Sequence, residues 1–185
     1  MKTLKNQMIP MRDGVRLATD LYLPEKEGAY PIVLMRTPYN KEGIVKDPLY
    51  EEFPRLIANG YGVAVQDCRG TLASEGKMNL NGGNEQEDGY DAVEYLASQP
   101  FCDGNVGMFG LSYFGFTQIA AASEKPPHLK AICPFMCCSL HSFGTSPMQT
   151  IAPFHLGWAY GQLLEHPEEY FKDPGERERL VPILQ

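Results

Sequence analysis

The sequence lacks any apolar run long enough to cross a membrane, and its first residues lack the apolar core of a secretory signal. It also lacks clusters of lysine and arginine, and its 185 residues carry a formal net charge of −7 at pH 7. Both features argue against nucleic acid or an anionic membrane surface as the main partner. We therefore expect a cytoplasmic protein that acts on a small molecule or a short peptide.

A regular cysteine framework is also missing. Five cysteines, an odd number, fit a reducing compartment better than a disulfide scaffold. The stretch CPFMCC (Cys133, Cys137 and Cys138) suggests metal binding, yet no second Cys/His pair at zinc spacing accompanies it. We favour structural, buried thiols, because free cysteine is among the most buried residue types, and we expect no metal and no cofactor.

The residues that are present suit one soluble globular domain, with 43% hydrophobic and 21% charged residues. Near the start, Asp13-Gly14 separates two extended runs, and alternate residues of the second run, from Val15 to Leu23, are mostly apolar. Asp-Gly supplies the positive φ angles of a tight turn, so this segment predicts a β-hairpin. The runs PIVLMRTPY and YGVAVQDCRG are nearly continuously apolar and predict strands buried on both faces, as in a parallel sheet.

Two helices are predicted between and after these strands. PLYEEFPRLIANG indicates a short helix that tolerates Pro54 in its first turn and ends at Asn59-Gly60. In NEQEDGYDAVEYLASQP, Asn84 is a candidate N-cap, and Glu87, three residues later, completes a capping-box pattern. The small and apolar residues of this second helix recur at helical spacing on one face: Gly89, Ala92, Val93 and Leu96.

The alternation of strands and helices continues to residue 138. A short apolar strand, NVGMFG, leads into a helix of small residues, YFGFTQIAAAS, and a last strand in LKAICPFMC covers about Leu129 to Phe135. This order indicates a mostly parallel, doubly wound α/β sheet begun by an antiparallel hairpin. Beyond it the sequence is aromatic and broken by proline, and helical where it is periodic. We therefore divide the chain into an α/β unit, residues 1–138, and the start of an inserted helical cap, residues 139–185.

A serine stands at the corner between the NVGMFG strand and the next helix, in the stretch GMFGLSYFG. A serine at such a corner is exposed above the sheet edge, and its neighbours must be small because the turn strains the backbone. Gly110 and Gly115 suit this role, whereas Phe114 stands where the general nucleophile pattern has glycine. On this stretch alone, Ser112 is either a nucleophile or a serine that caps a helix.

Five motifs, in the order RDGVRLATDLYLP, RTPYNK, GYGVAVQDCRG, SEGK and CDGNVGMFGLSYFG, resemble the Xaa-Pro dipeptidyl-peptidase and cocaine esterase family of α/β-hydrolases. The likeness covers residues 8–138. Members of this family carry Gly-x-Ser-Tyr-x-Gly, so Phe114 fits the family's pattern. The resemblance implies an α/β-hydrolase fold, here truncated before its last strands, and it makes Ser112 the nucleophile that forms an acyl-enzyme.

The resemblance carries over two further positions. Tyr39 in RTPYNK matches the tyrosine whose hydroxyl helps to hold the oxyanion of the tetrahedral intermediate in this family. Tyr113 would supply the second donor from its backbone N–H, at the start of a helix where unsatisfied amides point outward. The alternative for Tyr39 is a core tyrosine at the end of a buried strand.

Other polar residues near the predicted site have structural interpretations. Asp67 and Arg69 lie at the C-terminal end of a strand, where ligands usually bind in such sheets, but we favour a role in fixing a loop by hydrogen bonds and ion pairs. Three carboxylates suit the N-terminus of the following helix through its dipole, and we assign them no catalytic role: Glu85, Glu87 and Asp88.

No residue of the chain resembles the family's catalytic histidine or acid. A serine hydroxyl needs a base, and in α/β-hydrolases the acid and the histidine follow the serine on later strands. None of the four histidines lies in a segment that resembles the family's histidine loop: His128, His141, His155 and His166. We expect these 185 residues to be the N-terminal part of a longer hydrolase.

Two functions are compatible with the sequence. In the first, the complete protein is a serine hydrolase, and the resemblance leaves open dipeptide release from Xaa-Pro peptides, ester hydrolysis, and acylation or deacylation of β-lactam side chains. In the second, the chain is a non-catalytic remnant that binds a ligand or partner. Because the last strand would leave its edge open, we expect self-association or a complementing chain there.

Overall fold

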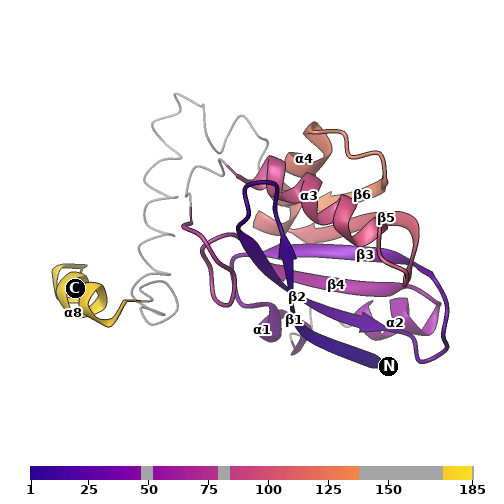
Figure 1. Ribbon diagram of the computed structural model, residues 1–185, viewed down its shortest axis with the longest axis horizontal. Helices are drawn as coiled ribbons and strands as arrows, with labels where there is room; N and C mark the ends of the chain where they lie inside the picture. Colours follow the sequence, from indigo (N-terminus) through magenta and orange to yellow (C-terminus); the bar gives the residue numbers. More distant parts are fainter. Residues whose placement is uncertain (47–51, 79–83, 138–172, 185) are drawn as a thin grey trace.

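The computed structural model describes residues 1–46, 52–78, 84–137 and 173–184 (Figure 1). Its elements are β1 (Lys2–Pro10), β2 (Arg16–Leu23), β3 (Tyr30–Thr37), α1 (Lys41–Lys46), α2 (Glu52–Ala58), β4 (Gly62–Asp67), α3 (Glu85–Ala97), β5 (Cys102–Leu111), α4 (Tyr113–Ser123), β6 (Leu129–Phe135) and α8 (Pro174–Leu184). Within these residues, six strands form one sheet in the order β1-β2-β4-β3-β5-β6. The pairs β1–β2 and β2–β4 are antiparallel and the other three are parallel, which confirms the predicted α/β sheet with an antiparallel start.

The N-terminal hairpin forms as predicted. The N–H of Met11 donates to the carbonyl of Val15 (2.8 Å) and closes the turn between β1 and β2. Of the Asp-Gly pair, only Gly14 has a positive φ, 87°, so the turn needs one left-handed residue rather than two. β2 is buried along nearly its whole length, so both of its faces contribute to the core.

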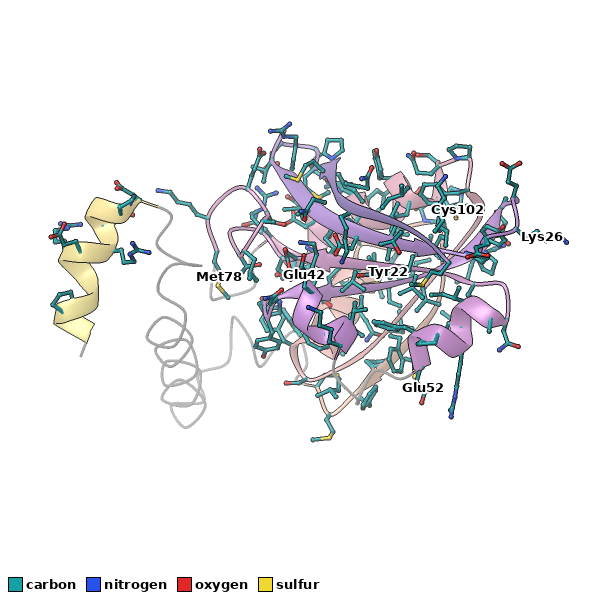
Figure 2. The ribbon with its side chains drawn as sticks, turned by 90° about the horizontal axis from the view of Figure 1, so that it is seen from below. Tyr22, Lys26, Glu42, Glu52, Met78 and Cys102 are labelled. Atoms are coloured by element: carbon teal, nitrogen blue, oxygen red, sulfur yellow. The ribbon has the colours of Figure 1, made fainter. Side chains whose placement is uncertain are left out.

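The core has two halves, one on each face of the sheet. Figure 1 shows α3 and α4 on one side of the sheet and α1 and α2 on the other, and Figure 2 shows Glu42 of α1 and Glu52 of α2 on the same face. Successive side chains of a strand point to opposite faces. Leu34 therefore joins the cluster that includes α3, whereas the next residue, Met35, joins Ile44 of α1 and Phe53 of α2.

The helix α3 confirms one prediction and corrects another. The four residues expected on its inner face are buried: Gly89, Ala92, Val93 and Leu96. The capping box is wrong, because Asn84 lies in the helical region (φ −112°, ψ −7°) and its side chain makes no capping hydrogen bond. A side-chain cap usually requires an extended N-cap residue. Asn84 instead accepts the N–H of Asp88 with its backbone carbonyl (2.9 Å).

The strand β6 confirms the last predicted strand, but five of its seven residues are exposed. Cys133 is exposed on it, and Cys137 just after it is half-buried. The expectation of buried thiols therefore holds for Cys68 and Cys102 and is wrong for Cys133 and Cys137. The physical reason is that, in the described ranges, no helix covers the outer face of β6. Cys138 and most of the predicted cap lie outside the described residues. The described part of the predicted cap is residues 173–184, which contain α8.

Within the described ranges, no helix combines the length and the apolar character that a membrane span requires.

Candidate active site

The corner between β5 and α4 presents Ser112 at the surface. Ser112 is exposed, with φ 55° and ψ −122°, and such a backbone costs of order 1–3 kcal/mol in a residue with a Cβ. Its N–H donates to the carbonyl of Phe135 on β6 (3.1 Å), and its carbonyl accepts the N–H of Gly115 (3.0 Å). The hydroxyl makes no capping hydrogen bond to the described backbone of α4. A strained, exposed serine at a strand-to-helix turn has the geometry of a nucleophile elbow.

The glycines beside Ser112 are required by space. A Cβ on Gly110 would lie 2.6 Å from the Cβ of Phe114, and Gly110 also has a φ of 146°. A Cβ on Gly115 would lie 2.5 Å from the Cβ of Cys137. Both positions therefore exclude any side chain, which agrees with the small neighbours expected from the sequence.

Tyr39 reaches the same corner from β3. Because β3 and β5 are parallel neighbours, the segments after these two strands emerge at one edge of the sheet. The half-buried ring of Tyr39 lies edge-on to Phe114, with centroids 5.3 Å apart, and to Tyr113, at 6.4 Å. The structure thus brings Tyr39 against the two residues after Ser112. Its packing also suits the alternative of a core tyrosine, so its role in the oxyanion hole stays a prediction.

The side chain of Tyr113 turns away from the surface. It is 4% exposed, and its hydroxyl donates to Oε1 of Glu85 (3.1 Å). Burial raises the pKa of Tyr113, and the negative charge of Glu85 raises it further, so the phenol stays a protonated donor at neutral pH. Only the backbone of Tyr113 is left to serve the predicted oxyanion hole, and that role too stays a prediction.

A buried ion pair between Arg36 and Glu85 lies beneath the corner, and the sequence analysis did not predict it. Nη1 of Arg36 lies 2.7 Å from Oε2 of Glu85. Burial alone would lower the pKa of Arg36, but the nearby carboxylates raise it above its ordinary value. The one signal in the sequence is an arginine inside the apolar run PIVLMRTP, because a buried charge needs a partner.

The first turn of α3 also corrects our interpretation of its carboxylates. Glu85 and Asp88 are 6% and 1% exposed, and they pair with buried or half-buried arginines rather than only with the helix dipole. The carboxylate of Asp88 accepts from Nη2 and Nε of Arg69 (2.6 and 2.9 Å). Of the three acidic residues, Glu87 alone is exposed, and it too faces an arginine, with its Oε1 3.7 Å from Nη1 of Arg12.

Asp67 and Arg69 fix loops, as the favoured interpretation predicts. Asp67 accepts the backbone N–H of Lys41 (3.0 Å) and its Nζ (2.8 Å), and both side chains are buried. Lys41 begins α1 two residues after Tyr39, so Asp67 fastens the segment that carries Tyr39. Arg69 joins Asp13 of the first turn (2.7 Å) to Asp88.

The described residues place no histidine beside Ser112. His128 precedes β6, and its carbonyl accepts the N–H of Val106. Val106 and Ser112 are six residues apart along β5, about 20 Å, and the ring of His128 contacts Glu94 (2.7 Å) instead. The other three histidines lie outside the described residues: His141, His155 and His166. No group of three or more potential metal ligands was found among the described side chains.

Comparisons with known proteins agree with this fold. A family model described as X-Pro dipeptidyl-peptidase (S15 family) matches residues 13–152. The chain is 45% identical over 132 residues to the cocaine esterase of Rhodococcus sp. (strain MB1 Bresler), a match that covers 71% of this chain and 23% of the esterase.

Solved structures give the same picture. An aminopeptidase from the marine sediment archaeon Thaumarchaeota archaeon matches with a TM-score of 0.65 and 32% identity over 74% of this chain and 25% of its own. An α-amino acid ester hydrolase matches with a TM-score of 0.64 and 34% identity over 71% of this chain and 24% of its own. The chain therefore spans about a quarter of the length of these relatives.

Proposed function

This chain belongs to the X-Pro dipeptidyl-peptidase (S15) family, and the similar proteins named above are hydrolases. We therefore propose that the complete protein is a serine hydrolase that cleaves an ester or amide bond. The observation that supports the proposal best is the exposed Ser112 at φ 55°, at the corner that Tyr39 also reaches. In this proposal Oγ of Ser112 attacks the carbonyl carbon of the substrate, and a base outside the described residues takes its proton.

The proposed oxyanion hole has two donors. When Oγ bonds to the carbonyl carbon, the carbonyl oxygen becomes an oxyanion, and the hydroxyl of Tyr39 and the N–H of Tyr113 donate to it. The first N–H groups of a helix have no partner within the helix, and its dipole favours negative charge there. The intermediate then collapses, the alcohol or amine leaves with a proton from the base, and water hydrolyses the acyl-enzyme by the same steps.

The substrate class is inferred from the chemistry of this site and from the relatives. An esterase, an aminopeptidase and an ester hydrolase are among the similar proteins, and all three act on a carbonyl with a heteroatom leaving group. We propose a small-molecule ester or amide, or a short peptide. The proposed nucleophile and both proposed donors act on the carbonyl group alone, so they would serve any of these substrates alike.

A fluorophosphonate probe tests the proposal in the complete natural protein. We expect one label, found by peptide mapping on Ser112, and loss of p-nitrophenyl acetate hydrolysis in step with labelling. Ser123→Ala is the matched control, because Ser123 ends the same helix and donates to the carbonyl of Ala120 (2.7 Å). Labelling elsewhere, with hydrolysis intact in Ser112→Ala, would overturn the proposal.

A further inference from the structure

A row of buried polar side chains crosses three neighbouring strands. The strand register places Thr19 of β2 opposite Gln66 of β4, and Gln66 opposite Arg36 of β3, so all three lie on one face. Each is 0% exposed. Nε2 of Gln66 donates to Oγ1 of Thr19 (2.9 Å), and Nε of Arg36 donates to Oε1 of Gln66 (2.8 Å). The row holds the guanidinium of Arg36 in one orientation.

Arg36 in turn fixes Glu85 at the start of α3. Nη1 of Arg36 lies 2.7 Å from Oε2 of Glu85 and donates to the backbone carbonyl of the same residue (3.1 Å). Nη2 lies 3.8 Å from Oδ2 of Asp88. A buried charge is tolerated only with such partners. The side chain and the backbone of Glu85 are therefore both tied to the sheet.

Besides a hydrogen bond with the side chain of Cys68, Glu85 has a contact that leads to the corner. Its Oε1 accepts the hydroxyl of Tyr113 (3.1 Å). The ring of Tyr113 also packs edge-on against Phe116, with centroids 5.5 Å apart. Tyr113 is the first residue of α4 and directly follows Ser112. A polar path thus runs from the middle of the sheet to the residue beside the serine.

We propose that Glu85 is a positioning residue for the hydrolysis: by accepting the hydroxyl of Tyr113 it fixes the direction in which the Tyr113 N–H faces the oxyanion. This role rests on the proposed function of the site. An oxyanion donor works only when it is aligned with the position that the charge will occupy, and a misplacement of about 1 Å can cost about 10² in rate. Glu85 acts through Tyr113 rather than on the substrate.

Tyr113→Phe in the complete protein tests this role, because it deletes the hydroxyl and keeps the ring, the backbone N–H and every charge. We expect kcat for p-nitrophenyl acetate to fall roughly 10- to 100-fold with KM little changed. The matched control is Tyr22→Phe (Tyr22 is labelled in Figure 2), which deletes a hydroxyl that accepts from Nζ of Lys5 (2.8 Å). Tyr22 lies on β2, which β4 and β3 separate from β5. This control should keep kcat within about twofold of the parent.

Glu85→Gln provides a second measurement, because its amide oxygen can still accept from Tyr113. Where this variant folds, we expect kcat between those of the parent and Tyr113→Phe. The double variant should show no additional loss of kcat, since in this proposal both changes affect kcat through the hydrogen bond between Glu85 and Tyr113. Where it does not fold, Tyr113→Phe decides alone. If Tyr113→Phe keeps the kcat of Tyr22→Phe while Ser112→Ala is inactive, the role of Glu85 is overturned. Hydrolysis retained by Ser112→Ala overturns the proposed function and this role with it.

Discussion

The corner that carries Ser112 and the neighbouring strand β6 differ in how their side chains are partnered. Beneath the corner, buried charges meet partners from other elements, such as Arg36 with Glu85 and Lys41 with Asp67. On β6 most residues are exposed, and Ile132 and Phe135 are 38% and 39% exposed. An open cavity of about 500 Å³ with mostly apolar lining lies beside β6, and Glu52, labelled in Figure 2, stands at it.

The comparison extends to the two edges of the sheet. β1, the edge strand at the other side, is irregular between Leu4 and Gln7, has a positive φ at Asn6, and carries Lys5 paired with Asp20. Bulges and lysines are devices that discourage pairing with another strand. β6 also carries such devices, because its pairing with β5 is irregular at Lys130 and Pro134 lies within the strand. The two edges therefore differ in the side chains that they expose, which are polar on β1, such as Lys2 and Gln7, and include the apolar Ile132 and Phe135 on β6.

The largest expected effect concerns Ser112. In the complete protein, Ser112→Ala should lower kcat for p-nitrophenyl acetate by roughly 10⁶, because the members of a catalytic triad act as a unit. The 185-residue chain alone should hydrolyse this ester no faster than its own Ser112→Ala variant, since its described residues supply no base at the corner. Turnover by the isolated chain that Ser112→Ala abolishes would show that a base lies within it, and His141 and His155 would then be mutated first.

Tyr39→Phe in the complete protein should have the next largest effect. A donor that acts mainly in the transition state should cost roughly 10²–10³ in kcat, about 2.7–4 kcal/mol, with KM little changed. Tyr61→Phe is the control on the open side, because Tyr61 lines the cavity beside β6. If Tyr39→Phe loses only about 1 kcal/mol of unfolding free energy and keeps more than about half of kcat, Tyr39 is a packing residue.

Cysteine alkylation compares the two regions directly. Cys68 is 2% exposed, and burial raises its pKa well above the ordinary value. At pH 8 it therefore holds less of the reactive thiolate than a free cysteine, whereas Cys133 is exposed on β6. We expect iodoacetamide to modify Cys133 at least about tenfold faster than Cys68. Peptide mapping measures both rates, and equal rates in the folded chain would show that the core beneath the corner is open.

The smallest effect concerns self-association through β6. The open edge should pair with a second copy of the isolated chain, and Ile132→Lys should raise the dissociation constant about fivefold, ~1 kcal/mol, through like charges at the new interface. Gln7→Lys adds the same charge to the β1 edge and should change nothing. Sedimentation velocity measures both variants. A cooperatively folding monomer as the parent chain would contradict the expectation.

Local signals in the sequence were sufficient to predict most of the helices and strands and the strand-to-helix corner at Ser112. The hairpin, the parallel strands and the helices α2, α3 and α4 follow from turn chemistry and periodicity, which act over a few residues. The helix α1, with six residues, was not predicted. The capping box failed because the match of Asn84 and Glu87 says nothing of the backbone angles that a side-chain cap requires.

The sequence by itself determined the class of sheet, the small residues around Ser112 and, through family motifs, which side chains to examine. Only the tertiary structure decided which of the 23 acidic residues pairs with Arg36, and that Glu85 meets Tyr113, 28 positions away. It also decided that Cys133 is exposed. The physical reason is that a buried charge needs a partner of opposite charge, but the sequence around it does not specify which residue that partner is. The partner is chosen by which helix covers which strand, and that depends on packing between segments far apart in the chain.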